Sequence, residues 1–246
     1  MSLMQDRVVV VTGGGAGIGE ACVERFLAEG ATVEAWDRDP ASTEKPGVVH
    51  RIVDVSSADS VREAAQAAVA QHGRVNVLVN CAGVITENKP AQDVDPADYR
   101  KNFDVNVMGI VHTARELHAT LSESKGAIVN VASQAALVCL PHQSAYSASK
   151  GAVAALTRSQ AIDWAAEGLR VNAVCPGFTL TAMAEKQMTP ELDAAVSRRV
   201  PLGRFFQPVE IANSILFLGS DLASAITGVV MPVDGGWTAG EPALPM

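Results

Sequence analysis

Short runs of β-branched residues alternate with longer alanine-rich stretches along almost the whole chain. The runs expected to form strands are Arg7–Thr12, Ala31–Asp37, Val48–Asp54, Val75–Asn80, Gly126–Ala132, Leu169–Cys175 and Ile226–Val233. Helices are expected between them, at Ile18–Glu29, Ala58–His72, Pro96–Leu121, Ser144–Ala166 and Pro208–Leu218. Such alternation predicts parallel strands joined by right-handed crossovers, with helices on both faces of the sheet. We therefore expect an α/β fold of three layers, with a doubly wound parallel sheet of about seven strands.

One segment interrupts this alternation. Residues 177–207 are too many for an ordinary connection between a strand and a helix. A loop of this length in a compact domain usually has a function, and we expect residues 180–206 to form a lid over a substrate site. No shift in composition divides the 246 residues, so they are predicted to form one domain, 1–246.

The formal net charge of −8 disfavours several classes of partner. Nucleic acids and anionic membranes bind basic surfaces, so neither is expected as a partner. No apolar run is long enough to span a bilayer and no leader segment is evident, so a cytoplasmic location is expected. The four cysteines are scattered without the spacing of metal ligands, which favours reduced thiols and no metal site.

A glycine-rich turn follows the first predicted strand and leads into the first predicted helix. Its sequence is Thr12-Gly-Gly-Gly-Ala-Gly-Ile-Gly19. Glycines let the backbone take positive φ angles and approach a pyrophosphate closely, and a helix start supplies N–H groups and the positive end of a dipole. A turn of this kind between a strand and a helix predicts a dinucleotide-binding site, although a tight structural turn would have the same composition.

Asp37 ends the second predicted strand, 18 residues after Gly19. A carboxylate there can accept hydrogen bonds from the adenosine ribose hydroxyls and would repel a 2′-phosphate. Position 16 is Ala rather than a cation, and Arg38 is the one residue that points the other way, toward NADP. The sequence therefore favours NAD.

Tyr146 and Lys150 are four residues apart in a predicted helix, so their side chains share one face. A nearby ammonium and an oxidised nicotinamide ring both favour the phenolate, and we expect the pKa of Tyr146 to fall below its usual value of about 10. Ser133 ends the fifth predicted strand, at the edge where ligands bind in open α/β sheets, and can hold a substrate oxygen. Tyr146 and Lys150 could also have this spacing by chance, and Ser133 could be an ordinary serine at the end of a strand.

Together these residues resemble the short-chain dehydrogenase/reductase superfamily, in its single-domain Rossmann-fold branch. The resemblance rests on the order and spacing of the glycine turn, Asn80-Cys-Ala-Gly83, Asn106, Ser133, Tyr146-xxx-Lys150 and Pro176-Gly177. It runs from Val8 to about Trp237. Cys81 departs from the family pattern, which more usually has a second Asn at this position.

The resemblance implies a role for each residue. Tyr146 would be the general acid/base, Lys150 would bind the nicotinamide ribose and lower the pKa of Tyr146, and Ser133 would orient the substrate oxygen. Asn106 would hold a water in a proton relay that runs through Lys150. The implied cofactor contacts are Gly13, Gly15, Gly17, Ile18, Gly19, Asp37, Arg38, Asp54, Val55, Asn80, Ala82, Gly83, Tyr146, Lys150, Pro176, Gly177, Thr179 and Thr181.

The C-terminal third resembles the branch that reduces 3-oxoacyl thioesters, and its catabolic relatives, through Val200-Pro-Leu-Gly-Arg204 and Asp234-Gly-Gly236. The biosynthetic enzymes of that branch typically carry a basic residue in the glycine turn, where this chain has Ala16, and prefer NADPH. The resulting prediction is a homotetrameric oxidoreductase that interconverts a secondary alcohol and a ketone with NAD. The alternatives are an NADPH-dependent 3-oxoacyl thioester reductase of fatty-acid synthesis and a non-catalytic nucleotide-binding regulatory module.

Overall fold

The structure is a computed structural model that describes residues 2–39, 45–185 and 188–240. Within these residues, seven parallel strands form one sheet in the order β3-β2-β1-β4-β5-β6-β7. The strands are β1 (Val8–Thr12), β2 (Thr32–Asp37), β3 (Val48–Ile52), β4 (Val77–Asn80), β5 (Ala127–Val131), β6 (Arg170–Pro176) and β7 (Val230–Val233). The strand order reverses between β1 and β4, which is the point where ligands bind in sheets of this type.

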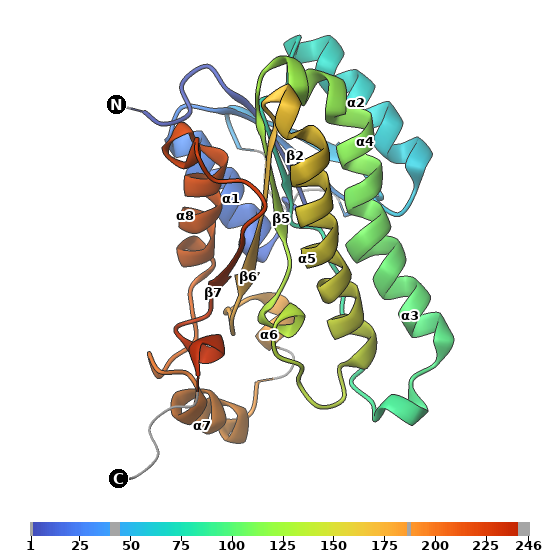
Figure 1. Ribbon diagram of the computed structural model, residues 1–246, viewed down its shortest axis with the longest axis vertical. Coiled ribbons are helices and arrows are strands. Elements are labelled where there is room, and N and C mark those ends of the chain that lie inside the picture. Colours follow the sequence, from blue (N-terminus) through green and yellow to red (C-terminus); the bar gives the residue numbers. More distant parts are fainter. Residues whose placement is uncertain (1, 40–44, 186–187, 241–246) are drawn as a thin grey trace.

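Helices cover both faces of the sheet, and Figure 1 shows α1 and α8 on one face and α2, α4 and α5 on the other. The helices are α1 (Gly17–Ala28), α2 (Ala58–His72), α3 (Pro96–Phe103), α4 (Gly109–Glu123), α5 (Ser144–Trp164), α6 (Ala182–Glu185), α7 (Pro190–Arg199) and α8 (Pro208–Gly219). The predicted three-layer Rossmann fold is confirmed. Across the described ranges, no helix combines the length and hydropathy needed to cross a bilayer.

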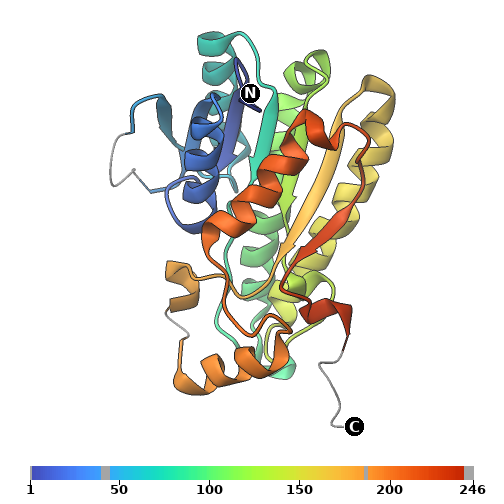
Figure 2. The same ribbon diagram turned by 90° about the vertical axis from the view of Figure 1, so that its left-hand side faces the viewer.

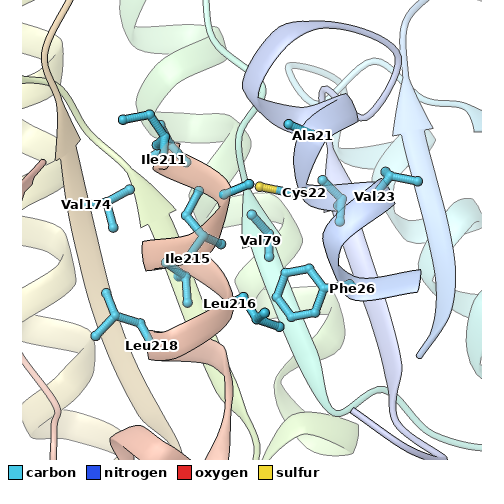
Figure 3. Packing of buried hydrophobic residues seen from close by; sticks show 14 of the residues in the cluster. Ala21, Cys22, Val23, Phe26, Val79, Val174, Ile211, Ile215, Leu216 and Leu218 are labelled. Carbon is cyan, nitrogen blue, oxygen red and sulfur yellow. The ribbon is translucent and has the colours of Figure 1, made fainter. Parts of the chain in front are cut away.

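The apolar strands are buried from both sides. Val9 packs with Phe26 of α1 and Ile215 of α8, in the cluster that Figure 3 shows. The next residue, Val10, points to the opposite face and packs with Leu117 of α4 in a second cluster. Successive side chains of a strand point to opposite faces, so a strand between two helical layers is mainly apolar, as the run of four valines in β1 is.

The long helix predicted over Pro96–Leu121 is interrupted. A π-helical turn at Asp104–Met108 separates α3 from α4. π-Helical turns are rare and occur frequently at functional sites, and this one contains Asn106. The predicted last strand is also shorter than expected, because Gly228 has a φ of +76° and the strand begins only at Val230.

The segment predicted as a lid lies beyond the carboxyl ends of the strands. Figures 1 and 2 show α6 and α7 below the sheet, at the end opposite the amino-terminal residues. Residues 186 and 187, which belong to the predicted lid, lie outside the described residues. Phe178 and Phe206 tie the two ends of the segment together, because the Phe206 N–H donates to the Phe178 carbonyl at 2.8 Å.

Candidate active site

The glycine turn between β1 and α1 folds against the end of β4. Gly13 and Gly17 have φ angles of +66° and +58°, which residues with side chains rarely adopt. A Cβ atom at Gly13 would lie 2.9 Å from the backbone nitrogen of Ala82, and one at Gly19 would overlap the Gly13 carbonyl oxygen. Thr12 joins the two loops, because its hydroxyl oxygen accepts the Ala82 N–H at 3.1 Å. The start of α1 therefore lies open to a ligand, and no side chain caps it.

The Asp37 carboxylate lies directly beside this turn. Its Oδ2 accepts the N–H of Gly15 at 2.9 Å, which holds the end of β2 against the glycines. Arg38 is largely exposed, with 69% of its side chain accessible, and its guanidinium lies 3.8 Å from the carboxylate of Asp39. The Asp37 carboxylate is therefore held at the turn by a hydrogen bond, whereas the Arg38 side chain next to it is largely in solvent.

A cavity of about 420 Å³ extends from the glycine turn to the start of α5. This volume lies within the usual range of small-molecule sites, roughly 300–1,000 Å³. Of the residues that sequence analysis assigned to the site, those that line this cavity are Gly13, Gly17, Ile18, Gly19, Asp37, Arg38, Asp54, Val55, Ala82, Gly83, Ser133, Tyr146, Lys150, Pro176, Gly177, Thr179 and Thr181.

Ser133, Tyr146 and Lys150 meet at one end of the cavity. Tyr146 and Lys150 lie one turn apart on α5, and the Lys150 Nζ is 5.7 Å from the centroid of the tyrosine ring. The lysine is almost completely buried, and its Nζ donates to the carbonyl of Val131 at 2.8 Å. Ser133 follows β5, and its Oγ accepts the Ala135 N–H at 3.1 Å. A hydroxyl, a phenol and an ammonium thus share one small space.

Comparison with known proteins identifies the family. The family model described as enoyl-(acyl carrier protein) reductase matches residues 13–238. An uncharacterized short-chain type dehydrogenase/reductase of Sinorhizobium fredii is 41% identical over 94% of the chain. This chain belongs to the short-chain dehydrogenase/reductase family. It spans 43% of the length of the Sinorhizobium fredii protein.

Two further relatives of this short-chain dehydrogenase/reductase match over almost their whole lengths. The cis-4-hydroxycyclohexanecarboxylate dehydrogenase of Sinomonas cyclohexanicum is 37% identical, over 95% of this chain and 97% of that protein. The structure of a 3-ketoacyl-(acyl-carrier-protein) reductase from Brucella melitensis, complexed with NADH, superimposes with a TM-score of 0.89. It is 32% identical and covers 95% of this chain and 99% of the other. The protein is therefore an oxidoreductase of this family.

Members of this family bind a nicotinamide cofactor, and the cavity of this short-chain dehydrogenase/reductase fits one. The turn at one end is a cradle that a side chain at Gly13 or Gly19 would fill. A Cβ at Gly17 would also lie 3.1 Å from the Thr181 side chain, so a larger residue at this position would crowd the cavity wall. The opposite end of the same cavity holds Tyr146 and Lys150.

Burial shifts the pKa values of Tyr146 and Lys150 on α5, and for Tyr146 the direction is opposite to the one expected from the sequence. Burial lowers the pKa of Lys150 to about 8, because the charged form loses hydration. Burial raises the pKa of Tyr146, and the hydrogen bond with Ser133 lowers it by less. The expected fall in the pKa of Tyr146 is therefore not produced by the protein groups alone. The reason is that the sequence shows the lysine's charge but not the desolvation of the phenol.

Asn106 lies behind the cavity wall, in the π-helical turn. Its Oδ1 accepts the N–H of Val84 at 2.8 Å, and its Nδ2 donates to the Val84 carbonyl at 2.9 Å. The Nδ2 also donates to the Ser149 hydroxyl at 2.9 Å, and that hydroxyl donates to the Tyr146 carbonyl at 2.7 Å. The asparagine thereby connects the loop after β4 to the helix that carries Tyr146 and Lys150.

Asn80, which the sequence placed among the cofactor contacts, also lies behind the wall. Its Nδ2 donates to Asn130 at 2.9 Å, and its Oδ1 accepts the Thr113 hydroxyl at 2.7 Å. Both partners are buried, on β5 and α4. The side chain therefore joins two strands and a helix just below the point where the loop Cys81–Gly83 enters the cavity.

The cavity is also lined by residues that were not assigned individual roles from the sequence, among them Cys81, Gln134, Gln143 and Phe178. Gln134 follows Ser133, is 6% exposed, and its Oε1 has no partner among the described residues. The one feature of the sequence that could have pointed to Gln134 as a site residue is that it follows Ser133, at the end of a predicted strand. Burial raises the pKa of the Cys81 thiol to about 12, so this cysteine is an un-ionised part of the wall. Among the described residues, no cluster of three or more His, Cys, Asp or Glu could hold a metal ion.

Proposed function

We propose that this short-chain dehydrogenase/reductase interconverts secondary alcohols and ketones, with NAD as the cofactor and Tyr146 as the general acid/base. The observation that carries the choice of cofactor is the Asp37 carboxylate, held 2.9 Å from the Gly15 N–H beside the glycine turn. An anchored anion at this point accepts hydrogen bonds from a ribose diol and repels a 2′-phosphate. The residues that would hold the cofactor are the glycine turn, Asp37, Asp54 and Lys150.

The residues at the other end of the cavity divide the proton chemistry between them. The bound oxidised nicotinamide ring supplies the acceptor for the carbinol hydride. Tyr146 Oη takes the proton of the alcohol hydroxyl in oxidation and returns it in reduction. Ser133 Oγ accepts the Ala135 N–H, which leaves its own proton for the hydrogen bond with Tyr146 or, once substrate is bound, for the substrate oxygen. Lys150 favours the phenolate of Tyr146 when its Nζ is protonated.

The proposed proton relay involves the π-helical turn. The side-chain amide of Asn106 is already used by Val84 and Ser149. We infer that a relay water would form its hydrogen bond with the backbone of this turn rather than with the Asn106 side-chain amide. The amide would instead hold the turn in place. No step in this scheme requires a metal ion.

A second function is favoured by Arg38, which lines the cavity next to Asp37. If its guanidinium turned toward a 2′-phosphate, the protein would suit NADPH and the reduction of a 3-oxoacyl thioester. The Brucella melitensis structure described as a 3-ketoacyl-(acyl-carrier-protein) reductase is a neighbour of this chain and is complexed with NADH. A non-catalytic nucleotide-binding module is the remaining alternative.

Titration of the purified protein with NADH and with NADPH, followed by cofactor fluorescence, separates these functions. We expect NADH to bind at least tenfold more tightly than NADPH, and secondary alcohols to be oxidised with NAD. A preference for NADPH would make the thioester reductase the better proposal. Tight NADH binding without oxidation of any alcohol in a broad panel would favour the non-catalytic module.

We also propose that residues 1–246 act as one domain, with residues 180–206 as a lid over the substrate, and that four copies assemble. The assembly would use the helices that contain residues 96–121 and 144–166. Ile162 on α5 supports this, because 78% of this apolar residue is exposed. Light scattering that shows a monomer would contradict the tetramer.

A further inference from the structure

A second cavity, of about 510 Å³, adjoins the first on the side of α7. Leu140, Gln143 and Phe178 line both cavities, so the two spaces meet at these three side chains. Gln143 and Tyr146 lie three residues apart at the start of α5. A ligand held at Ser133 and Tyr146 in the first cavity would therefore lie next to the second.

The walls of the second cavity are mainly apolar. Phe178 stacks on Trp237, with ring centroids 4.6 Å apart and an angle of 25° between the rings. Leu192 and Val196 of α7 line the same space. The guanidinium of Arg199 lies 5.8 Å from the Trp237 ring, and it donates to the Gly240 carbonyl at 3.1 Å. The rings of Phe178 and Trp237 and the aliphatic side chains of Leu192 and Val196 thus line one space of small-molecule size.

We propose that the second cavity binds the apolar body of the substrate, and that the substrates are secondary alcohols and ketones with a hydrocarbon group of several carbons. This proposal rests on the proposed function, because the reacting oxygen must lie at Ser133 and Tyr146. Polyols are disfavoured, since Asn88, Gln143 and Arg199 are the polar residues of a lining that is otherwise apolar, and most additional hydroxyls would lose water without finding hydrogen-bond partners. Apolar carbons gain from leaving water there.

The size of the expected preference follows from the cost of leaving an apolar group in water. Burial of one methylene is worth about 0.8 kcal/mol, which is about fourfold in kcat/KM. Three added carbons, from 2-propanol to cyclohexanol, should therefore raise kcat/KM on the order of 50-fold. Threitol, a four-carbon polyol, should fall below 2-propanol. A flat response to hydrocarbon size, or a preference for threitol, would overturn this proposal and leave the proposed function intact.

A pair of variants on α7 tests whether the second cavity causes the preference. Ala195 lines the cavity, so Ala195→Phe fills part of it without removing an existing side chain. Ala194 is exposed on the same helix and lines neither cavity, so Ala194→Phe is the matched control. We expect Ala195→Phe to lower the ratio of kcat/KM for cyclohexanol to that for 2-propanol at least tenfold, and Ala194→Phe to leave the ratio within twofold of wild type. Equal ratios in both variants would contradict the assignment.

A binding measurement keeps this test independent of turnover. Calorimetry with cyclohexanone is performed on Tyr146→Phe saturated with NADH, and on the same protein carrying Ala195→Phe as well. We expect binding in the first and at least a tenfold weaker affinity in the second. If no alcohol is oxidised but this difference is found, the proposed function fails while the apolar site stands. If cyclohexanone binds neither protein or both equally, the apolar site is wrong.

Discussion

The hydroxyl of Ser149 donates a hydrogen bond of 2.7 Å to the backbone carbonyl of Tyr146, and it accepts one of 2.9 Å from Asn106. Ser149 is completely buried, one residue before Lys150. The hydroxyl thus bridges the π-helical turn and the helical turn that carries the proposed acid/base. We regard Ser149 as a positioning residue, because its side chain does not line the cavity.

Ser149→Ala should lower kcat about tenfold and leave NADH affinity within twofold. The variant removes the 2.9 Å acceptor of a buried Asn106 N–H and leaves it the more distant Asn102 Oδ1 at 3.5 Å, which costs roughly 1–3 kcal/mol of stability and loosens the turn beneath Tyr146. The measurements are steady-state kinetics as a function of pH, urea unfolding and NADH titration. Ser149→Thr, which keeps a hydroxyl, should recover most of kcat.

Ser147 provides the matched control for this prediction. It is a buried serine on the same helix, and its hydroxyl has no partner among the described residues. Ser147→Ala should therefore leave kcat and stability close to wild type. An equal loss of kcat in both alanine variants would mean that the bridge from Asn106 to Tyr146 has no special role.

Tyr146→Phe should reduce turnover by roughly 10²–10⁴-fold, because the proton of the substrate hydroxyl loses its acceptor. NADH affinity should change little, since the ring remains. The chain has one other tyrosine, Tyr99, whose hydroxyl donates to Ser144 at 2.9 Å. Tyr99→Phe should keep turnover within about twofold. Substantial turnover in Tyr146→Phe would disprove the assigned role.

Asp37→Asn should shift the ratio of NADPH to NADH affinity toward NADPH on the order of tenfold, because the repulsion of a 2′-phosphate is removed. The asparagine can still accept the Gly15 N–H, so the turn should keep its shape. Fluorescence titration with both cofactors measures the ratio. Asp39→Asn, which changes the exposed carboxylate near Arg38, should leave it unchanged. If both variants behave alike, cofactor choice depends on the overall charge of this loop.

The buried lysine should make stability depend on pH. Burial lowers the pKa of Lys150 to about 8 from the value of 10.5 expected in the unfolded chain. Between these values the unfolded chain binds more protons than the folded protein, so the contribution of Lys150 to the free energy of unfolding rises with pH. From pH 8 to pH 10.5, wild type should gain up to about 3 kcal/mol relative to Lys150→Met.

Urea unfolding of wild type and Lys150→Met at several pH values from 7 to 10.5 measures this difference. Burial raises the pKa of the Cys175 thiol to about 11, so the contribution of this thiol to the free energy of unfolding falls as pH rises. Both proteins contain the same buried thiols, so this contribution cancels when the free energy of unfolding of Lys150→Met is subtracted from that of wild type. Lys101→Met, at an exposed lysine of α3, is the control for the removal of a surface charge. A constant difference between wild type and Lys150→Met across the range would show that the lysine keeps an ordinary pKa.

Much of the architecture could be predicted because it depends on local order. Uniformly apolar runs such as that of β1 show that a strand is covered on both faces, and the helix that follows each of them implies a parallel sheet. The glycine turn could be placed because its neighbours, a strand and a helix, are adjacent in the chain. The interruption at Asp104–Met108 could not, because that segment has the composition of an ordinary helix and its bond to Val84 joins residues 22 positions apart.

The sequence by itself determined the order of strands and helices, the glycines of the turn, the carboxylate at Asp37 and the four-residue spacing of Tyr146 and Lys150. Only the tertiary structure decided the rise in the pKa of Tyr146, the bond between Asn106 and Ser149 across 43 positions, and the second cavity between Phe178 and α7. The physical reason is the same in each case. Desolvation, buried hydrogen bonds and cavity shape depend on which distant segments pack together, and the periodicity of a sequence reports only what each segment can do alone.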